Sequence, residues 1–267
     1  MTILDRIVQT KRKEVELAKR QRSKAELRAA IDRVDGPRDF FAAVTAQSPD
    51  GINLIAEIKR RSPSAGLIVE DFDPGRIART YNDCGAAALS VLTDETYFGG
   101  NLAHLADVKR SVPLPVLRKD FIVDEYQVYE SRAAGADAIL LIVEAIGVSC
   151  VAELLSIARR LGMCVLVEVH SGANLEAILD TAGPPGEGYL LGINNRDLAA
   201  QRTDLSTTTR LAALLPPATA FVAESGIATR SDVLTLRKAG ACAILVGESL
   251  LRADDIRAKI HELLGRH

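Results

Sequence analysis

The sequence predicts an α/β protein that folds as a (β/α)8 TIM barrel with an N-terminal helical extension. After residue 52, eight short apolar runs alternate with amphipathic stretches, a pattern typical of strands that are buried on both faces and joined by helices. The chain has 267 residues. This length suits one barrel of roughly 250 residues, although two domains of roughly 150 residues would also fit.

The repeating units can be placed one by one along the chain. We expect strands over 52–59, 86–92, 115–119, 137–143, 163–169, 188–193, 219–224 and 243–247. The helices between them are expected over 74–84, 101–111, 124–134, 147–161, 172–182, 204–215 and 229–239. Asp124 and Ser171 are suitable N-caps, and a Gly-Ala step that ends three of the helices suits the left-handed C′ position. A doubly wound open sheet is the alternative, but no Gly-rich nucleotide loop follows the first strand.

Residues 1–48 are expected to form the helical extension, and residues 49–267 a single catalytic barrel. Apolar residues recur in the extension at spacings near three and four, as in an amphipathic helix: Ile3, Leu4, Ile7, Val8, Val15 and Ala18. Pro37 precedes a second short helix, expected over 38–47. The extension is either a plug over one end of the barrel or part of a lid over the substrate.

Composition excludes several classes of protein. Lys and Arg number 33 against 35 Asp and Glu, so no broad basic surface for nucleic acid or an anionic membrane is expected. No apolar run approaches the roughly 18 residues of a membrane span, and the charged N-terminus lacks the apolar core of a secretion signal. The four scattered cysteines indicate neither a zinc site nor a disulfide framework. We expect a cytoplasmic protein that is a monomer or a weak homo-oligomer.

Polar residues stand at the carboxyl ends of the predicted strands, where barrels of this class hold their active sites. From the first strand to the seventh they are Glu57 and Lys59, Thr93, Lys119, Glu144, Glu168, Asn194 and Glu224, and the eighth strand ends at Gly247. Buried charges are costly unless they are paired, so the lysines and glutamates are predicted to meet in one pocket. Such crowding shifts pKa values and suits acid–base catalysis. The alternative is an ion-pair network that only holds the barrel mouth together.

A phosphate site is predicted at the turns after the seventh and eighth strands, which contain Ser-Gly-Ile (225–227) and Gly-Glu-Ser (247–249). Backbone N–H groups and helix N-termini at these turns bind phosphate in many barrels. Ser62, on the loop after the first strand, adds a hydroxyl donor. The expected phosphate ligands are therefore Ser62, Gly226, Gly247 and Ser249. The four histidines form no spaced metal-binding set, so neither a metal nor a cofactor is expected.

Six motifs at these strand ends together resemble the indole-3-glycerol-phosphate synthase family. They are IAEIKRRSPSAG (55–66), LRKDFIVDEYQ (117–127), LVEVH (166–170), GINNRDL (192–198), AESGI (223–227) and VGESLLR (246–252). The resemblance covers nearly the whole chain. It implies one barrel with a helical extension that is partly a substrate lid. The implied reaction converts 1-(2-carboxyphenylamino)-1-deoxyribulose 5-phosphate, a phosphorylated small molecule, into indole-3-glycerol phosphate with loss of CO2 and water.

The resemblance also implies catalytic roles. Lys119 would be a general acid, and Lys59 would pair with the substrate carboxylate. The division of acid roles between the two lysines stays open. Glu168 would be the acid and base of the dehydration, and Glu57 would orient the lysines.

Substrate-binding roles follow in the same way. Asn194, Glu224 and Ser225 would hold polar groups of the substrate, and Arg196 would organise the loop after the sixth strand. Phe98, Phe121 and Leu141 are candidates for an apolar wall around the anthranilate ring, although core packing explains Leu141 equally well.

Two other functions remain open. A phosphoribosyl isomerase would share the phosphate turns but would call for an Asp or Cys as acid and base, and the lysine pair Lys59 and Lys119 argues against it. A non-catalytic phosphosugar-binding barrel would bind the ligand without turning it over. The extension lacks Trp, so an aromatic contact that some relatives make there is expected to be replaced or absent. No residues follow 267 for a second barrel, and a monofunctional enzyme is expected.

Overall fold

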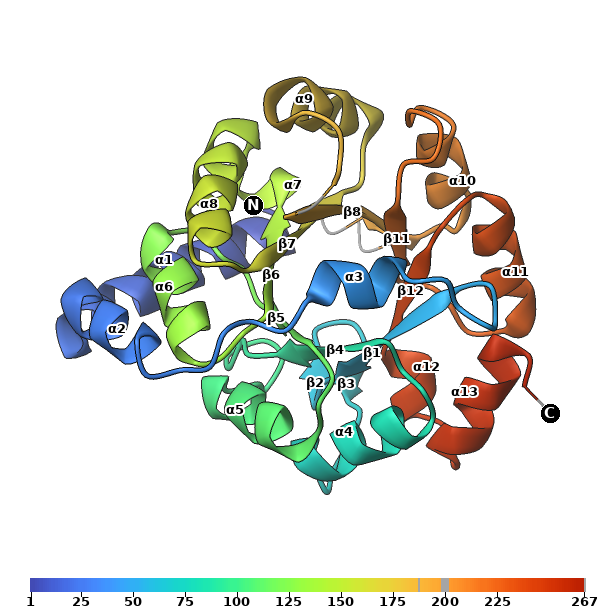
Figure 1. Cartoon of the computed structure of the whole chain (residues 1–267), viewed down its shortest axis with the longest axis horizontal. Helices are drawn as coiled ribbons and strands as arrows, with labels where there is room; N and C mark the ends of the chain where they lie inside the picture. The colour runs from blue at the N-terminus through green and yellow to red at the C-terminus, as the bar shows by residue number, and fades with distance from the viewer. Residues whose placement is uncertain (187, 198–201, 267) are drawn as a thin grey trace.

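The computed structural model describes residues 1–186, 188–197 and 202–266, and it forms a closed barrel of eight parallel strands inside a ring of helices (Figure 1). Around the barrel the order is β1-β12-β11-β8-β7-β6-β5-β4. These strands are β1 (Asn53–Ile58), β4 (Ala88–Leu92), β5 (Val116–Lys119), β6 (Ala138–Ile142), β7 (Cys164–Val169), β8 (Tyr189–Asn194), β11 (Phe221–Glu224) and β12 (Ala243–Val246). The predicted barrel is confirmed, with each strand within about two residues of its expected bounds.

The helices around the barrel follow the predicted order. They are α4 (Pro74–Asp83), α5 (Leu102–Ser111), α6 (Glu125–Ala133), α8 (Val148–Arg160), α9 (Gly172–Ala182), α10 (Ser206–Ala212) and α11 (Arg230–Lys238). Asp124 and Ser171 cap α6 and α9 as predicted. Gly85, Gly135 and Gly240 follow their helices with φ of 72°, 91° and 98°, which confirms the left-handed turns into the next strands.

Several elements were not predicted. The helices α7 (Val143–Ile146) and α12 (Glu248–Leu251) are too short to produce a periodic pattern. The helix α13 (Ile256–Leu264) is the last helix of the chain. Two small hairpins pair β2 (Arg61–Ser62) with β3 (Gly66–Leu67), and β9 (Arg196–Asp197) with β10 (Arg202–Thr203). No helix in the described part of the chain has the length and apolar character of a membrane span.

The N-terminal extension contacts both ends of the barrel. It contains α1 (Ile3–Gln21), α2 (Lys24–Ile31) and α3 (Phe40–Thr45). The helix α3 lies across the end where the strands begin (Figure 1), with Phe40 and Val44 packed into the barrel interior. The side chain of Asn53, at the start of β1, donates to the Val44 carbonyl at 2.8 Å. The helix α3 therefore covers the end of the barrel where the strands begin.

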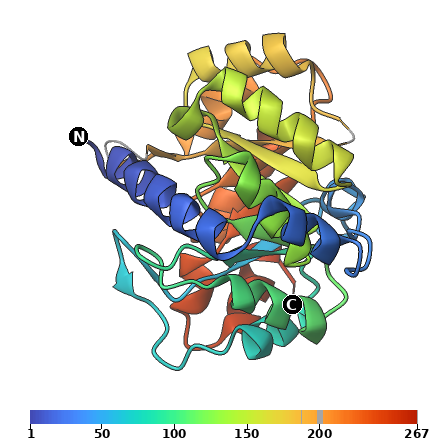
Figure 2. The same ribbon diagram turned by 90° about the vertical axis from the view of Figure 1, so that its left-hand side faces the viewer.

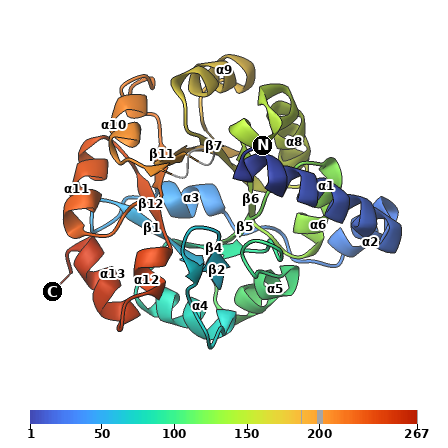
Figure 3. The ribbon, with the colours of Figure 1, turned by 180° about the vertical axis from the view of Figure 1, so that it is seen from behind.

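The helix α1 lies at the opposite end of the barrel. Viewed from the side and from behind, it runs past the ends of β5 and β6 (Figures 2 and 3). Its residues Leu4, Ile7 and Val8 pack in the same interior cluster as Phe121 and Ile142. The extension therefore closes one end of the barrel and borders the other, where the strands finish.

Candidate active site

A cavity of about 410 Å³ opens at the carboxyl ends of the barrel strands. All but one of the predicted site residues line it, namely Glu57, Lys59, Ser62, Phe98, Lys119, Phe121, Glu168, Asn194, Arg196, Glu224, Ser225, Gly226, Gly247 and Ser249. They lie at the ends of strands around the barrel or on the loops that follow them. The closed topology brings them together because the parallel strands all end on the same face.

Leu141 is the exception, and its proposed place in the apolar wall is corrected. It is fully buried among residues that pack between the strands and the helices, outside the barrel. Its neighbours Leu140 and Ile142 line the cavity, because successive side chains of a strand point to opposite faces. The wall that does face the cavity includes Phe98 and Phe121, whose ring centroids are 6.1 Å apart.

Lys119, at the end of β5, lies between two carboxyl groups. Its Nζ atom is 3.3 Å from Oε2 of Glu168 and 3.7 Å from Oε2 of Glu224. Burial by itself would lower the pKa of Lys119, but Glu168, Glu224 and Glu57 outweigh burial and raise that pKa. Lys119 is therefore an ammonium group at neutral pH, with a proton to donate. Asn194 fixes the other oxygen of Glu168 by donating from Nδ2 to Oε1 at 2.8 Å.

Within the described part of the chain, Glu224, at the end of β11, lacks the hydrogen bonds that hold Glu168 in place. Both of its oxygens are buried and find no hydrogen-bond partner among the described residues. Burial first, and the nearby Glu168 carboxylate second, raise the pKa of Glu224 well above its ordinary value. The room for this side chain comes from Gly192 in β8, where a Cβ atom would lie 2.3 Å from Oε1 of Glu224. A glycine inside a predicted strand was the signal that could have revealed this contact.

Lys59 and Glu57, at the end of β1, form a second ion pair in the cavity, with Nζ 2.7 Å from Oε1. Burial would raise the pKa of Glu57, but Lys59 and Lys119 outweigh it and the pKa is lowered. Glu57 is thus a carboxylate that faces both lysines. A Cβ atom at Gly247 would lie 2.4 Å from Oε1 of Glu57, so glycine at this position leaves space for the carboxylate.

The predicted phosphate residues gather at one side of the cavity mouth. Ser225 and Gly226 both have positive φ, at 67° and 77°. The Ser249 hydroxyl donates to the Ile227 carbonyl at 2.8 Å, and the Ser62 hydroxyl accepts from the Ala65 N–H at 3.1 Å.

Two arginines tie the loops at this mouth together. Arg196 donates to the Ser64 hydroxyl at 3.0 Å and lies 3.9 Å from the Glu248 carboxylate, so it links the loops after β1, β8 and β12. Arg252 was not predicted as a site residue. It also lines the cavity and donates to the Ala65 carbonyl at 2.9 Å.

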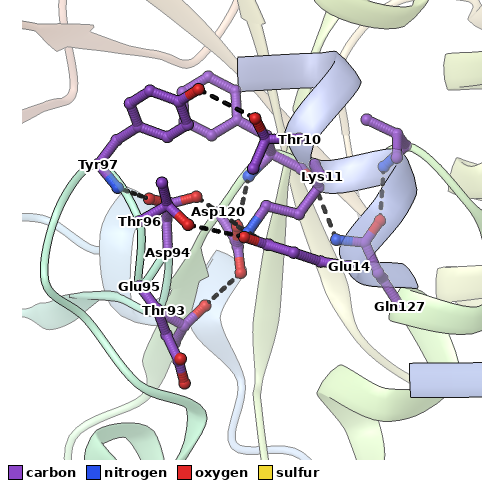
Figure 4. Close-up of polar contacts among 12 residues, drawn as sticks. Thr10, Lys11, Glu14, Thr93, Asp94, Glu95, Thr96, Tyr97, Asp120 and Gln127 are labelled. Atoms are coloured by element: carbon purple, nitrogen blue, oxygen red, sulfur yellow. Dashed lines mark hydrogen bonds and ion pairs between the residues drawn. The ribbon is translucent and has the colours of Figure 1, made fainter. Parts of the chain in front are cut away.

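A buried lysine that sequence reasoning missed joins α1 to this region. Nζ of Lys11 lies 2.9 Å from Oδ2 of Asp94, 3.0 Å from Oδ1 of Asp120 and 2.7 Å from Oε2 of Glu14 (Figure 4). Burial would raise the pKa of Asp120, but Arg118 and Lys11 lower it to about 2. Lys11 shares the apolar face of α1 with Ile7 and Val15, and a lysine on that stripe was the signal that could have found it.

The two aspartates hold the loops that carry the aromatic wall. Oδ1 of Asp94 accepts from the backbone N–H groups of Tyr97 and Phe98, at 2.7 and 3.2 Å. Oδ1 of Asp120 accepts from the backbone N–H of Phe121 at 2.8 Å. The helix α1 is thereby fastened to the strand ends around Lys119.

The described histidines and the four cysteines form neither a metal centre nor a disulfide. Among the described residues, no three His, Cys, Asp or Glu side chains are grouped so that they could hold a metal ion. Cys84, Cys150, Cys164 and Cys242 are free thiols.

Comparisons with known proteins identify the family of this chain. The family model described as indole-3-glycerol phosphate synthase matches residues 4–263. The indole-3-glycerol phosphate synthase of Roseiflexus sp. (strain RS-1) is 48% identical over 272 residues, covering 99% of this chain and 98% of the relative. That of Rhodopirellula baltica is 47% identical over 264 residues and 99% of both chains.

Solved structures of lower identity share the barrel. The 3-hexulose-6-phosphate synthase of Salmonella typhimurium has a TM-score of 0.61 at 14% identity, over 80% of this chain and 97% of its own. A tryptophan synthase α-subunit of Pyrococcus furiosus has a TM-score of 0.59 at 16% identity, over 81% and 98%. These two likenesses concern the fold alone. Because the family model matches nearly the whole chain and the relatives are 47–48% identical to it, the chain belongs to the indole-3-glycerol phosphate synthase family.

Proposed function

We propose that the cavity carries out its family's reaction by acid–base catalysis with lysine and glutamate side chains. The reaction converts 1-(2-carboxyphenylamino)-1-deoxyribulose 5-phosphate into indole-3-glycerol phosphate. The observation that carries the proposal is the position of Lys119, an ammonium group held within 3.7 Å of both Glu168 and Glu224 beside an aromatic wall. General acids placed in this way contribute roughly 10²–10⁴-fold to a rate.

Ring closure is the first chemical step. The aryl carbon that bears the carboxylate attacks the ketone carbon, and Lys119 donates a proton to the ketone oxygen as it becomes a hydroxyl. Lys59 pairs with the substrate carboxylate, and Glu57 holds Lys59 at 2.7 Å. The carboxylate then leaves as CO2, and its bonding electrons restore the aromatic ring.

Dehydration completes the indole. The new hydroxyl leaves as water with a proton from an acid, and the methylene carbon next to the ring nitrogen loses a proton to a base, so that the C2–C3 double bond of the indole forms and the nitrogen keeps its hydrogen. Glu168 fills this acid–base role, since it lies beside Lys119 and is oriented by Asn194 at 2.8 Å. Glu224 and Ser225 bind the hydroxyl groups of the substrate, together with Asn194.

The remaining cavity residues position the substrate. Its phosphate group lies at Ser62, Gly226, Gly247 and Ser249, and the anthranilate ring lies against Phe98 and Phe121. Arg196 keeps the surrounding loops in place through Ser64 and Glu248.

Compartment and assembly are further parts of the proposal. Residues 1–48 serve as an extension of one catalytic barrel, residues 49–267, and the protein works in the cytoplasm as a monomer or weak homo-oligomer. It binds neither nucleic acid nor membranes. Its four free thiols fit a reducing compartment, and its net charge of −2 gives no general attraction to polyanions.

A fluorescence assay tests the function. Purified protein is mixed with the carboxyphenylamino-deoxyribulose phosphate, and formation of the indole is followed by its fluorescence against a heat-killed control. A steady rise is expected. An isomerase or a non-catalytic phosphosugar-binding barrel would give no signal above the control, and that result would refute the proposal.

A further inference from the structure

We propose that Asn195 is a positioning residue for the substrate phosphate, because its side-chain amide sets the direction of the peptide between Ser225 and Gly226. This inference rests on the proposed function, which places the phosphate at that turn. Asn195 directly follows β8 and is fully buried. It does not line the cavity, whereas its neighbour Asn194 does.

The orientation of the Asn195 amide follows from its partners. Its Nδ2 atom donates to the Ser225 carbonyl at 3.1 Å. Its Oδ1 atom accepts from the backbone N–H of Thr208 at 3.1 Å and from the Thr208 hydroxyl at 2.7 Å. A backbone N–H can only donate and a carbonyl can only accept, so these contacts define which side of the amide faces Ser225. Asn195 thus connects the phosphate turn to α10.

The turn that Asn195 holds has an uncommon backbone. Ser225 has φ of 67°, a conformation that residues other than glycine keep only where their surroundings impose it. The hydrogen bond from Asn195 directs the Ser225 carbonyl toward the buried side of the turn. In a trans peptide the N–H points opposite to the carbonyl, so the N–H of Gly226 is directed toward the cavity.

The Gly226 N–H is available for an anion. It donates to no acceptor among the described residues, and Gly226 lines the cavity. A Cβ atom at this position would lie 2.5 Å from Cγ2 of Thr203, so the side chain of Thr203 packs closely against the Gly226 backbone. A hydrogen bond from this N–H to phosphate would be charge-assisted, and its direction depends on Asn195.

Two variants separate positioning from simple loss of packing. Asn195→Ala removes the bond to Ser225. The matched control Thr208→Val removes a buried hydrogen bond to the other side of the same amide. Both are expected to lower the thermal midpoint. Titration calorimetry with inorganic phosphate is expected to show about tenfold weaker binding for Asn195→Ala and a change below about twofold for Thr208→Val. KM should rise with the phosphate dissociation constant, while kcat stays within about twofold of the native value.

Unchanged phosphate affinity in Asn195→Ala, or an equal loss in both variants, would overturn the proposal. A second measurement needs no variant. Phosphate titrated into the native, isotope-labelled protein should shift the NMR amide signal of Gly226 toward that of a hydrogen-bonded N–H, and an unmoved signal would overturn it. Neither binding measurement requires turnover. Failure of the native protein to form indole would refute the proposed function without altering these results.

Discussion

Replacing Lys11 by methionine removes the ammonium group that lies between Asp94 and Asp120. Both carboxylates are buried, at 0% and 2% exposure, so they lose their charged partner at a place that bulk water solvates poorly. Breaking a buried ion pair by removing one partner destabilises a protein by about 3–5 kcal/mol. Asp120 keeps Arg118 at 3.0 Å and Asp94 keeps two backbone N–H donors, which favours the lower end of this range. A loss of about 3 kcal/mol corresponds to a Tm lower by roughly 6–12 °C.

The loss should depend on pH in a defined direction. In the native protein the pKa of Asp120 is lowered from 3.8 to about 2, so its contribution to stability is present above pH 3.8 and is lost as the pH falls through 2. Without Lys11, the buried Asp120 takes up its proton at a higher pH than in the native protein, and the variant gains stability relative to the native protein as the pH falls toward 2. The difference in Tm should therefore be smaller at pH 3 than at pH 7.

Thermal unfolding followed by circular dichroism at both pH values measures these effects. Lys13→Met is the matched control, because Lys13 is exposed on the same helix and its replacement should change Tm little. Lys109→Met breaks another ion pair, in which the half-buried Lys109 lies 2.7 Å from the buried Asp137, and shows the cost of such a loss elsewhere in the barrel. A Tm of Lys11→Met that equals that of Lys13→Met, or a deficit that is the same at both pH values, would refute the reasoning.

Two further predictions concern binding. Ser249→Asp places a negative charge at the phosphate side of the cavity and should raise KM at least about tenfold in steady-state kinetics; an unchanged KM would place the phosphate elsewhere. Leu140→Ala should raise KM because Leu140 lines the cavity, whereas Leu141→Ala should leave KM unchanged and lower the free energy of unfolding by about 2–5 kcal/mol. A raised KM in Leu141→Ala together with an unchanged KM in Leu140→Ala would show that Leu141, and not Leu140, contacts the substrate.

The sequence was sufficient for the barrel because each unit repeats the same physical pattern. Apolar runs, capping residues such as Asp124 and glycines such as Gly85 marked the units, and closure then placed the strand-end lysines and glutamates in one cavity. In a strand made only of apolar residues, the sequence did not show which side chains point into the barrel. Leu140 and Leu141 are equivalent in sequence, and only the strand register assigns Leu140 to the interior.

Contacts between residues far apart in the sequence could not be predicted from local sequence patterns either. Lys11 belongs to the first helix, and its partners Asp94 and Asp120 follow strands far along the chain. No local periodicity connects them. The same holds for Gly192, which looks like an ordinary strand glycine until Glu224 is seen to occupy the space beside it.

The division of roles between Lys119 and Glu168 is tested most directly by measuring CO2 release and indole formation in the same single turnover. Substrate labelled in its carboxylate carbon reports the first, and fluorescence the second. We predict that Lys119→Met slows both by about 10²–10⁴-fold, because ring closure precedes decarboxylation. Glu168→Gln should release CO2 well before indole appears, since only dehydration is blocked. Parallel loss of CO2 and indole in Glu168→Gln, or native CO2 release in Lys119→Met, would contradict these roles.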